Sequence, residues 1–500
     1  MNCYKTNKIF LEGVFICLLL PLNFFTMYNQ ATEIKRELLE RVSKLCFEGE
    51  LLEGIDRIPL EMRPKGSQLS RCCVHKDRAV IKYRLMIILG FRPDEEIDEL
   101  TMLKDYANKY RTPEEVDDVM LSVVDEACSS CLKYNYTVTN ICRGCVGHPC
   151  TYACNKSAIN VRKKAYIDQD ICVSCGRCMQ ACPYHAIVYT PVPCEEVCPV
   201  KAISKDYFGV EHIDPEKCIA CGKCKDICSY GAIMTKTTII EIIRDIMDEK
   251  KRVVAMVAPA LAGQYQATLP QILSAVKACG FDEVVEVAMG ANVTSMREAE
   301  EWTERVKEGG ENFMTTSCCP SYKLWAEKYL PELVPYISHT ATPAGYTAQI
   351  VKERYPGAST VFISPCVAKR IEGFQDDNID YVMTFEEVDA MMRAKGILVE
   401  ESEGYVPDNS IEKSGRLYAK SGGVATSVAK YLKNPSELKT EIINGLNKDT
   451  MKLLKTKATT GESESNLIEV MMCEGGCING CVVLANPKAA LRQLNALVKE

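Results

Sequence analysis

The chain has 500 residues, of which 47% are hydrophobic and 25% are charged, an ordinary globular composition that can bury a large core. This length exceeds that of one domain, so we expect two to four domains. The net charge of −7 argues against a nucleic-acid partner, because phosphate binding requires a basic surface.

Cysteine is the unusual part of the composition. Of the 28 cysteines, sixteen lie between Cys128 and Cys228, mostly at gaps of two or three residues. Disulfide scaffolds are usually short secreted chains with cysteine throughout. Short gaps let several sulfurs converge on one metal centre but make mutual disulfides awkward. The pattern therefore favours metal ligation over disulfides.

The first segment, residues 1–27, is an apolar extension that resembles a short signal or anchor. Glu12 and Pro21 interrupt it, and its apolar stretch over residues 13–25 is short for a membrane span of about 20 residues. Export would also oppose reduced thiols that carry clusters. We therefore expect a cytoplasmic protein, with membrane attachment as the weaker alternative. Either Met1 or Met27 could be the true start.

Residues 28–126 form the next segment, and their apolar periodicity is typical of helices. Thr112 followed by Pro113 resembles a helix N-cap. The adjacent pair Cys72 and Cys73 has no predicted role. Helices are predicted over residues 31–45, 77–91 and 112–127.

Residues 127–165 form an additional cysteine-rich segment, and residues 166–237 form a ferredoxin-like iron–sulfur segment. Both are rich in loops and leave little room for a hydrophobic core. Metal clusters must therefore supply much of the folding energy of this part of the chain.

Two stretches, ICVSCGRCMQACPYHAI and KCIACGKCKDICSYGAI, repeat the C-x-x-C-x-x-C-x-x-x-C spacing of a bacterial ferredoxin. Ser229 replaces the proline that follows the last cysteine of the first copy. In such repeats, three closely spaced thiolates bind one [4Fe–4S] cluster and the fourth crosses to the other cluster. A structural zinc site is the weaker alternative. The predicted ligand sets are Cys172, Cys175, Cys178 and Cys228 for one cluster, and Cys218, Cys221, Cys224 and Cys182 for the second.

Further cysteines around this repeat would suffice for one or two more clusters, whose ligand pairing the sequence does not determine. Cys128 and Cys131 are as compatible with a zinc site or free buried thiols as with a further cluster. Several clusters in series carry single electrons between a surface donor and a buried site, so the expected partner is a soluble redox protein. The remaining candidate ligands are Cys142, Cys145, Cys150, Cys154, Cys194 and Cys198.

From residue 250 to residue 500, strand-like and helix-like stretches alternate, which predicts parallel α/β units. Strands are predicted over residues 253–260, 283–290, 313–317, 359–366 and 381–385. Helices are predicted over residues 269–280, 294–310, 320–330, 386–396 and 487–500.

Three cysteine motifs lie in this α/β region: TSCCP at residues 316–320, SPCVAK at 364–369 and MMCEGGC at 471–477. The first two follow predicted strands, and ligands gather at the carboxyl ends of parallel strands. Four thiolates from three separate segments can close a cubane between two lobes of the fold.

These motifs resemble the three signature motifs of the iron-only, or [FeFe], hydrogenases, in the same order and at similar separations. The resemblance covers about residues 250–482 and, with the ferredoxin repeats, most of the chain after Cys142. It implies a hydrogenase domain of two α/β lobes with mostly parallel sheets flanked by helices. A ferredoxin-like α+β iron–sulfur domain and a helical N-terminal region would precede it. The implied activity is the reversible reduction of protons to dihydrogen with electrons from a ferredoxin.

The resemblance also implies an H-cluster, a [4Fe–4S] cubane bridged by Cys477 to a two-iron subsite. That subsite carries carbon monoxide, cyanide and a bridging azadithiolate, which dedicated maturation proteins install. The implied ligands of the cubane are Cys319, Cys366, Cys473 and Cys477.

The resemblance further implies that Cys318 passes protons to the bridging amine, much as a general acid does. Lys369 is expected to hydrogen-bond a cyanide, because a buried lysine needs an anion nearby. An inert buried cysteine, a surface lysine and a solvated glutamate-rich helix face are the corresponding alternatives. The implied proton relay between the surface and Cys318 consists of Glu298, Glu301, Ser338 and Glu372.

The sequence departs from the commoner enzymes of this family at three places. Ser364 stands where they have methionine, Ala344 where they have glutamine, and Cys481 interrupts a stretch that is glycine-rich in them. These differences resemble a clostridial-type subgroup and leave open the turnover rate, the direction and the oxygen sensitivity. The alternative functions are a dihydrogen sensor, an assembly relative without the two-iron subsite, and a polyferredoxin subunit.

Overall fold

The computed structural model describes residues 10–11, 14–15, 30–67, 71–96, 98–109, 120–128, 131, 134–407 and 411–499. Most of the predicted N-terminal extension, including Met27, therefore lies outside the described residues. Within it, β1 (Phe10–Leu11) pairs antiparallel with β2 (Val14–Phe15). Among the described helices, none combines the length and the apolar character that a bilayer crossing needs.

Helices form most of the described N-terminal region, as predicted for residues 31–45 and 77–91. Helix α1 (Gln30–Glu48) buries Leu38 and Val42, which lie four residues apart and so on one face. It packs on α17 (Phe385–Ala394) and α11 (Ile239–Met247). The N-terminal helices therefore pack directly against the C-terminal half of the chain. The other helices here are α2 (Leu51–Gly54), α3 (Ile58–Met62), α4 (Val74–Ile88) and α5 (Leu103–Asn108).

The helix predicted over residues 112–127 is wrong in its second part, and residues 112–119 lie outside the described residues. Leu121–Val123 forms strand β3, which pairs antiparallel with β10 (Ile233–Thr235). Only a single turn, α6 (Asp125–Cys128), follows it. The partner strand lies far along the chain, so local periodicity could not indicate the pairing.

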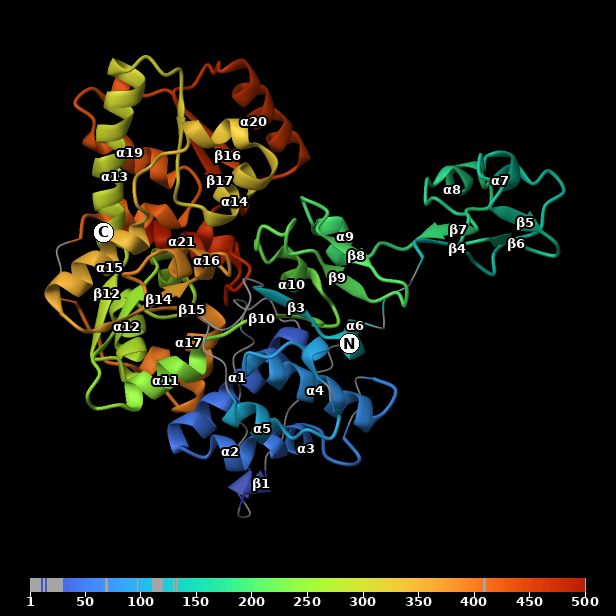
Figure 1. Cartoon of the computed structure of the whole chain (residues 1–500), viewed down its shortest axis with the longest axis horizontal. Coiled ribbons are helices and arrows are strands. Elements are labelled where there is room, and N and C mark those ends of the chain that lie inside the picture. Colours follow the sequence, from blue (N-terminus) through green and yellow to red (C-terminus); the bar gives the residue numbers. More distant parts are fainter. Residues whose placement is uncertain are drawn as a thin grey trace.

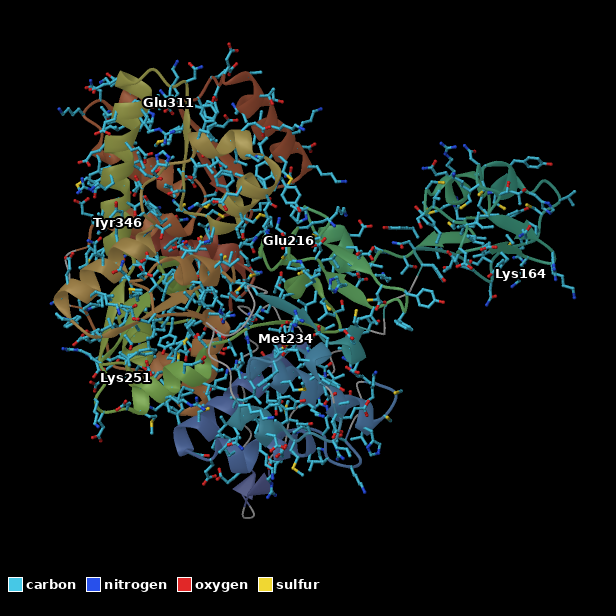
Figure 2. All side chains as sticks on the ribbon, in the orientation of Figure 1. Lys164, Glu216, Met234, Lys251, Glu311 and Tyr346 are labelled. Carbon is cyan, nitrogen blue, oxygen red and sulfur yellow. The ribbon has the colours of Figure 1, made fainter. Side chains whose placement is uncertain are left out.

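Residues 134–190 form a small body, here called the outer body, which stands apart from the rest of the molecule (Figure 1). Lys164 lies on it in Figure 2. Its β5–β6 pair crosses the segment boundary predicted at residue 165, so that boundary does not separate two bodies. The paired strands are β4 (Tyr136–Val138) with β7 (Ile187–Tyr189) and β5 (Ile159–Val161) with β6 (Ala165–Ile167). The helices are α7 (Pro149–Tyr152) and α8 (Arg177–Ala181).

A second small body, here called the inner body, lies between the outer body and the α/β region (Figure 1). It combines β3, α6 and β10 with residues 192–232. Its Ile203 and Ile213 share a buried cluster with Val367 and Val482 of the α/β region, so the two are packed together. Its other elements are the antiparallel pair β8 (Ile203–Lys205) and β9 (Glu211–Ile213) and the helices α9 (Pro193–Val197) and α10 (Lys223–Ile227).

The α/β region contains two parallel sheets, in agreement with the predicted α/β fold. The larger sheet has the order β12-β11-β14-β15, and the smaller has the order β13-β17-β16. Every residue of β11 and β17 is buried, as expected for parallel strands covered on both faces. The strands are β11 (Val253–Val257), β12 (Glu283–Glu286), β13 (Met314–Thr315), β14 (Ser359–Ser364), β15 (Tyr381–Thr384), β16 (Thr440–Asn444) and β17 (Leu467–Met471).

Helices flank both sheets (Figure 1), and α13 (Ala288–Trp302) begins inside the strand predicted to reach residue 290. It continues into a π-helical turn over Thr303–Glu308. Gly290 permits the close approach of α13 to α15, because a Cβ at this position would lie 2.1 Å from the Pro343 carbonyl oxygen of α15. The other helices are α12 (Leu269–Ala278), α14 (Pro320–Tyr329), α15 (Pro343–Arg354), α16 (Lys369–Gln375), α18 (Lys413–Arg416), α19 (Gly423–Tyr431), α20 (Lys448–Thr460) and α21 (Pro487–Lys499).

Candidate iron–sulfur active site

The three cysteine motifs of the α/β region meet at one cavity. Cys319 follows β13, Cys366 follows β14, and Cys473 follows β17, so strands of both sheets supply them at their carboxyl ends. Cys477, the last residue of the third motif, begins a 3-10 turn (Cys477–Asn479). The cavity is lined by Cys318, Cys319, Cys366, Lys369, Cys473 and Cys477, together with apolar residues that include Ala258, Pro259 and Phe362.

The thiols of this cavity fit a [4Fe–4S] cluster. Each iron of a cubane takes one cysteine thiolate, and the four predicted ligands all line the cavity. Burial raises the pKa of each of these thiols, that of Cys477 to about 12, so they ionise at neutral pH only when a metal binds them. No group of His, Cys, Asp and Glu side chains in the described ranges is arranged for a single metal ion. A cubane differs from such a site because it separates its thiolates over four irons.

Lys369 brings a positive charge to the same cavity. Its ammonium donates a hydrogen bond to Glu372 (2.5 Å), and the Thr342 hydroxyl donates one to the other Glu372 oxygen (2.5 Å). Burial disfavours the charged form of Lys369, but the Glu372 carboxylate outweighs it and raises the pKa of the lysine. Lys369 is therefore a cation beside the thiols, and its side chain is only 12% exposed.

Two of the departures from the commoner enzymes also lie at this cavity. Ser364 ends β14, and its hydroxyl oxygen accepts a hydrogen bond from the amide of Cys366 (3.2 Å). Ala344 lies in the first turn of α15. Both line the cavity, so the sequence differences alter its wall while the cysteines and Lys369 are kept.

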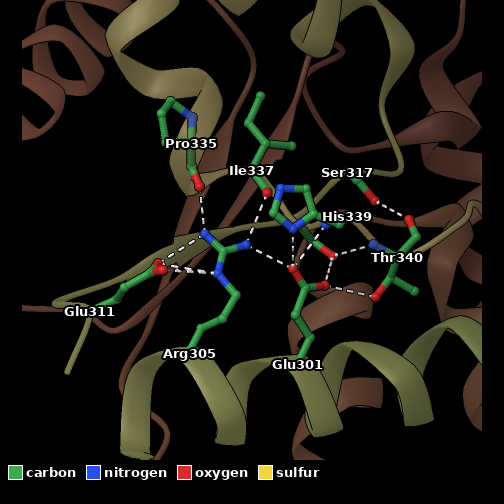
Figure 3. A network of polar contacts seen from close by, with 9 residues as sticks. Glu301, Arg305, Glu311, Ser317, Pro335, Ile337, His339 and Thr340 are labelled. Atoms are coloured by element: carbon green, nitrogen blue, oxygen red, sulfur yellow. Dashed lines mark hydrogen bonds and ion pairs between the residues drawn. The ribbon is translucent and has the colours of Figure 1, made fainter. Parts of the chain in front are cut away.

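A polar network surrounds Glu301 on α13 (Figure 3). Its carboxylate accepts hydrogen bonds from the Ser338 hydroxyl (2.6 Å), the His339 amide (2.9 Å) and the Thr340 hydroxyl (2.8 Å). It also pairs with Arg305 (2.7 Å). Burial acts to raise the pKa of Glu301, but the hydrogen bonds from Ser338 and His339 outweigh burial and lower it. Glu301 is therefore an ionised carboxylate near the surface, where the His339 side chain is 76% exposed.

Glu298 lies one helical turn before Glu301 and is fully buried. Neither carboxyl oxygen has a hydrogen-bond partner among the described residues. Burial raises the pKa of Glu298 to about 8, although the nearby Ser317 amide and Ser338 hydroxyl partly oppose that shift. After burial, the charge of Glu298 is the strongest influence that raises the pKa of Cys318.

The structure therefore brings Glu298, Glu301 and Ser338 together and groups Glu372 with Lys369 instead. Sequence reasoning missed Arg305, although it lies four residues after Glu301, at the spacing of a helical ion pair. It also missed Thr340, whose contact with Glu301 comes from the fold and leaves no local pattern. It also missed Glu469, whose carboxylate accepts hydrogen bonds from the amides of Gly422 (2.7 Å) and Ala425 (2.9 Å) at the start of α19. Burial raises the pKa of Glu469 to about 6. A single charged residue in the apolar strand LIEVM was the available signal.

The outer and inner bodies each contain a cavity lined by four cysteines, which corrects the predicted ligand sets. The exchange of Cys228 and Cys182 between the two repeats is wrong, because β4–β7 and β5–β6 close the outer body on itself. Each repeat instead meets a cysteine of an upstream C-x-x-x-C pair. The cavity of the outer body is lined by Cys154, Cys172, Cys175 and Cys178, and that of the inner body by Cys198, Cys218, Cys221 and Cys224.

Among the remaining cysteines of the outer body, Cys182 packs against the buried cluster that contains Cys150. The charges of Cys182 and Cys145 raise the pKa of the Cys150 thiol in addition to its burial. The sulfur of Cys142 accepts a hydrogen bond from the amide of Ala165 (3.4 Å). Cys182 is thus grouped with Cys150, upstream in the outer body, and not with the second ferredoxin repeat.

The inner body touches the α/β region next to its cavity. Cys221 lines both the cavity of the inner body and the cavity of the three motifs. Gly222 has a φ of +72° and no room for a side chain, since a Cβ there would lie 2.3 Å from the Cys481 sulfur. Cys481, which interrupts the expected glycine-rich stretch, is therefore part of this contact.

Comparison with protein families agrees with these motifs. Residues 251–481 match the model for the iron only hydrogenase large subunit, C-terminal domain. Residues 165–188 match a 4Fe-4S binding domain, and residues 188–239 match the LdpA Fe-S cluster-binding domain.

Similar proteins include hydrogenases and assembly factors. Iron hydrogenase 1 of Clostridium pasteurianum is 27% identical over 382 residues, which are 64% of this chain and 64% of that protein, less than two thirds of its length. The periplasmic [Fe] hydrogenase large subunit of Nitratidesulfovibrio vulgaris is 26% identical over 63% of this chain and 85% of its own. The cytosolic Fe-S cluster assembly factor NAR1 of Eremothecium gossypii is 29% identical over 25% of this chain and 29% of its own. A solved structure of a variant of the [FeFe]-hydrogenase HydA1 from Chlamydomonas reinhardtii has 22% identity and a TM-score of 0.44, and it covers 52% of this chain and 88% of its own.

The fold, the cysteine-lined cavities and the family matches define an iron–sulfur protein of the α/β class. It is an [FeFe]-hydrogenase-like protein with ferredoxin-type repeats, as the sequence motifs predicted.

Proposed function

We propose that this protein is an [FeFe] hydrogenase that catalyses the reversible reduction of protons to dihydrogen. The observation that carries the proposal is the single cavity at which the four ligand thiols, Cys318 and the Lys369 ammonium meet. When bound there, an H-cluster would supply the redox chemistry and the dihydrogen site. The proposed ligands are Cys319, Cys366, Cys473 and Cys477.

Side chains of the chain would move the proton. Glu298 retains its proton at neutral pH because its pKa is about 8, whereas Glu301 stays ionised. The proposed path runs from the exposed His339 through Glu301 and Ser338 to Glu298, and then to Cys318. Cys318 stands beside a ligand and can deliver the proton into the cavity as a general acid.

Lys369 and Glu372 have a different part in the proposal. The Lys369 ammonium would hold an anionic ligand of the cluster by a hydrogen bond, and Glu372 orients the lysine through its ion pair. Glu372 therefore acts as a positioning residue, because its own contacts are with Lys369 and Thr342 rather than with the Glu301 network.

Electrons would reach the cavity through the two small bodies. The proposed [4Fe–4S] ligands are the four cysteines around the cavity of the outer body and the four around the cavity of the inner body, and Cys142, Cys145, Cys150 and Cys182 hold a further cluster. Cys221 lines both the cavity of the inner body and the cavity of the three motifs, which supports a short final electron-transfer step between them. A ferredoxin or similar soluble carrier as electron donor, maturation proteins that install the two-iron subsite, and a cytoplasmic location belong to the same proposal.

An assembly role is the second candidate, because NAR1 proteins are among the similar proteins. An assembly factor without a two-iron subsite has no use for a proton path. The buried Glu298, whose charge acts on the Cys318 thiol, and the lysine in the cavity therefore favour the hydrogenase.

Infrared spectroscopy tests the proposal. Protein purified without oxygen after co-expression with hydrogenase maturation proteins should show carbon monoxide and cyanide stretches that shift under dihydrogen. If these bands are absent while the cubane clusters are present and a control hydrogenase is matured in parallel, the protein is an iron–sulfur relative with another task.

A further inference from the structure

The inner body contains four cysteines that the cavities described above do not use: Cys128, Cys131, Cys194 and Cys228. Cys128 and Cys194 are buried, and the half-buried Cys228 packs against the cluster that contains Cys194. None of the cysteines in the described ranges forms a disulfide.

The inner and outer bodies have the same cysteine pattern. In both, a C-x-x-C pair is followed by a C-x-x-x-C pair and then by C-x-x-C-x-x-C-x-x-x-C. In the outer body all of these motifs are consecutive. In the inner body the outer body separates the first two, because it lies between Cys131 and Cys194. The corresponding series are Cys142, Cys145, Cys150, Cys154, Cys172, Cys175, Cys178 and Cys182 in the outer body, and Cys128, Cys131, Cys194, Cys198, Cys218, Cys221, Cys224 and Cys228 in the inner body.

The strands follow the same correspondence. The outer body closes with the antiparallel pair β4–β7 and the inner body with the antiparallel pair β3–β10. The pair β5–β6 of the outer body corresponds to β8–β9 of the inner body. The two bodies are therefore copies of one fold, and one copy is inserted in the other.

Hydrogen bonds to sulfur match between the two copies. The sulfur of Cys142 accepts from the first residue of β6, Ala165 (3.4 Å), and the sulfur of Cys128 accepts from the first residue of β9, Glu211 (3.3 Å). A second set joins the last cysteine of each C-x-x-x-C pair to the amide four residues later. Its members are Cys154 with Ala158 (3.3 Å), Cys182 with Ala186 (3.4 Å), Cys198 with Ala202 (3.2 Å) and Cys228 with Ala232 (3.3 Å).

Each copy therefore has two sets of four cysteines. In the outer body, the set that does not line the cavity is Cys142, Cys145, Cys150 and Cys182. We propose that the equivalent set of the inner body, Cys128, Cys131, Cys194 and Cys228, holds a [4Fe–4S] cluster. All sixteen cysteines between Cys128 and Cys228 then serve four clusters, and Cys128 and Cys131 are neither a zinc site nor free thiols.

The electrostatics of the inner body agree with this grouping. Besides burial, the charges of Glu211, Cys228, Cys128 and Cys131 raise the pKa of Cys194 to about 12. Cys228 packs against the buried cluster that contains Cys128 and also against the one that contains Cys194. Lys205 pairs with Glu211 (2.7 Å) and Glu195 (3.1 Å) close by, so a cation lies beside the proposed anionic cluster.

Iron and sulfide analysis with Mössbauer spectroscopy of the whole chain tests the proposal. The protein is produced without maturation proteins, so the result does not depend on hydrogenase activity. The wild type should contain about 20 iron atoms in five cubanes, counting the one in the α/β region. Cys131→Ala and Cys131→Ala/Cys194→Ala should each contain about four iron atoms fewer. The matched control Cys46→Ala, in α1, should keep the wild-type content.

Two results would overturn the proposal. One is a wild type with about 16 iron atoms, with or without a stoichiometric zinc ion. The other is a Cys131→Ala/Cys194→Ala variant that keeps all of the wild-type iron. If the variants do not fold, the wild-type count and its zinc content decide alone.

Discussion

Cys318 is the residue whose replacement separates proton delivery from cluster binding. Cys318→Ala removes the thiol beside the cavity and leaves all four proposed ligands in place. We expect the infrared bands of the matured cluster to persist and the rate of dihydrogen evolution to fall by about 10²- to 10⁴-fold, the usual loss for a missing proton donor. Cys279→Ala, which alters a buried cysteine after α12, is the control and should keep the rate. A near-normal rate in Cys318→Ala would mean that protons take another path.

The raised pKa of Glu298 should make the stability of the folded protein depend on pH. Its folded-state pKa of about 8 lies above its ordinary value of 4.5, so the folded protein binds this proton more tightly than the unfolded chain does. The resulting stabilisation is complete below pH 4.5 and is lost as the pH rises through 8. Between about pH 5 and about pH 9, the melting temperature of the wild type should fall relative to that of Glu298→Gln. If the melting temperatures of the two proteins change by the same amount over this pH range, the Glu298 carboxyl is not protonated in the folded state.

Single residues also show how far the sequence could lead. The motifs located Cys319, Cys366, Cys473, Cys477 and Lys369, because spacing around strand ends is visible in a sequence. Thr340 and the amide of His339 could not be found in this way, since they reach Glu301 only through the packing of α13 against a loop. Arg305 lies four residues after Glu301, so its ion pair follows a spacing that the sequence does show.

At the level of elements, the close packing of α13 on α15 depends on Gly290. A Cβ at this position would lie 2.1 Å from the Pro343 carbonyl and 2.4 Å from the Thr347 hydroxyl. Gly290→Ala should therefore push the helices apart and destabilise the fold by about 1–3 kcal/mol, the usual cost of overpacking. Gly147→Ala, whose added Cβ meets nothing within 4 Å, should leave stability almost unchanged. Chemical denaturation of both variants measures the difference, and equal midpoints would contradict the predicted clash.

The elements that the sequence predicted are those with a strong local pattern. The buried strands around β11 and β14 and the helices α1 and α12 are apolar at regular intervals, so their positions were predicted closely. Strand β3 was predicted as a helix, because only its distant partner β10 makes it a strand. The exchange of ligands between the two ferredoxin repeats was predicted wrongly for a similar reason, since the insertion of one copy of the fold within the other changes which segments meet.

At the level of the whole molecule, the insertion makes the outer body removable. Its two ends lie together, because the Thr190 amide donates a hydrogen bond to the Asn135 carbonyl oxygen (2.7 Å). Replacement of residues 134–190 by a short glycine–serine linker should remove about eight iron atoms and leave the inner body folded.

The same deletion separates electron entry from catalysis. Dihydrogen evolution with a small viologen donor should continue in the deletion variant, because such a donor can reduce the inner body directly. Evolution with reduced ferredoxin should fall strongly if the outer body receives the electrons of a protein carrier. Equal ferredoxin-linked rates in the deletion variant and the intact chain would assign electron entry to the inner body instead.

The proposed function requires dihydrogen turnover at the cavity of Cys319, Cys366, Cys473 and Cys477. The most direct test is isotope exchange, in which the matured protein is incubated with dihydrogen in D₂O and the gas is followed by mass spectrometry. We expect steady formation of HD and D₂ by the wild type, with little formation by Cys318→Ala. A matured wild type that shows the carbon monoxide and cyanide bands but exchanges no more than Cys318→Ala would contradict the proposed function.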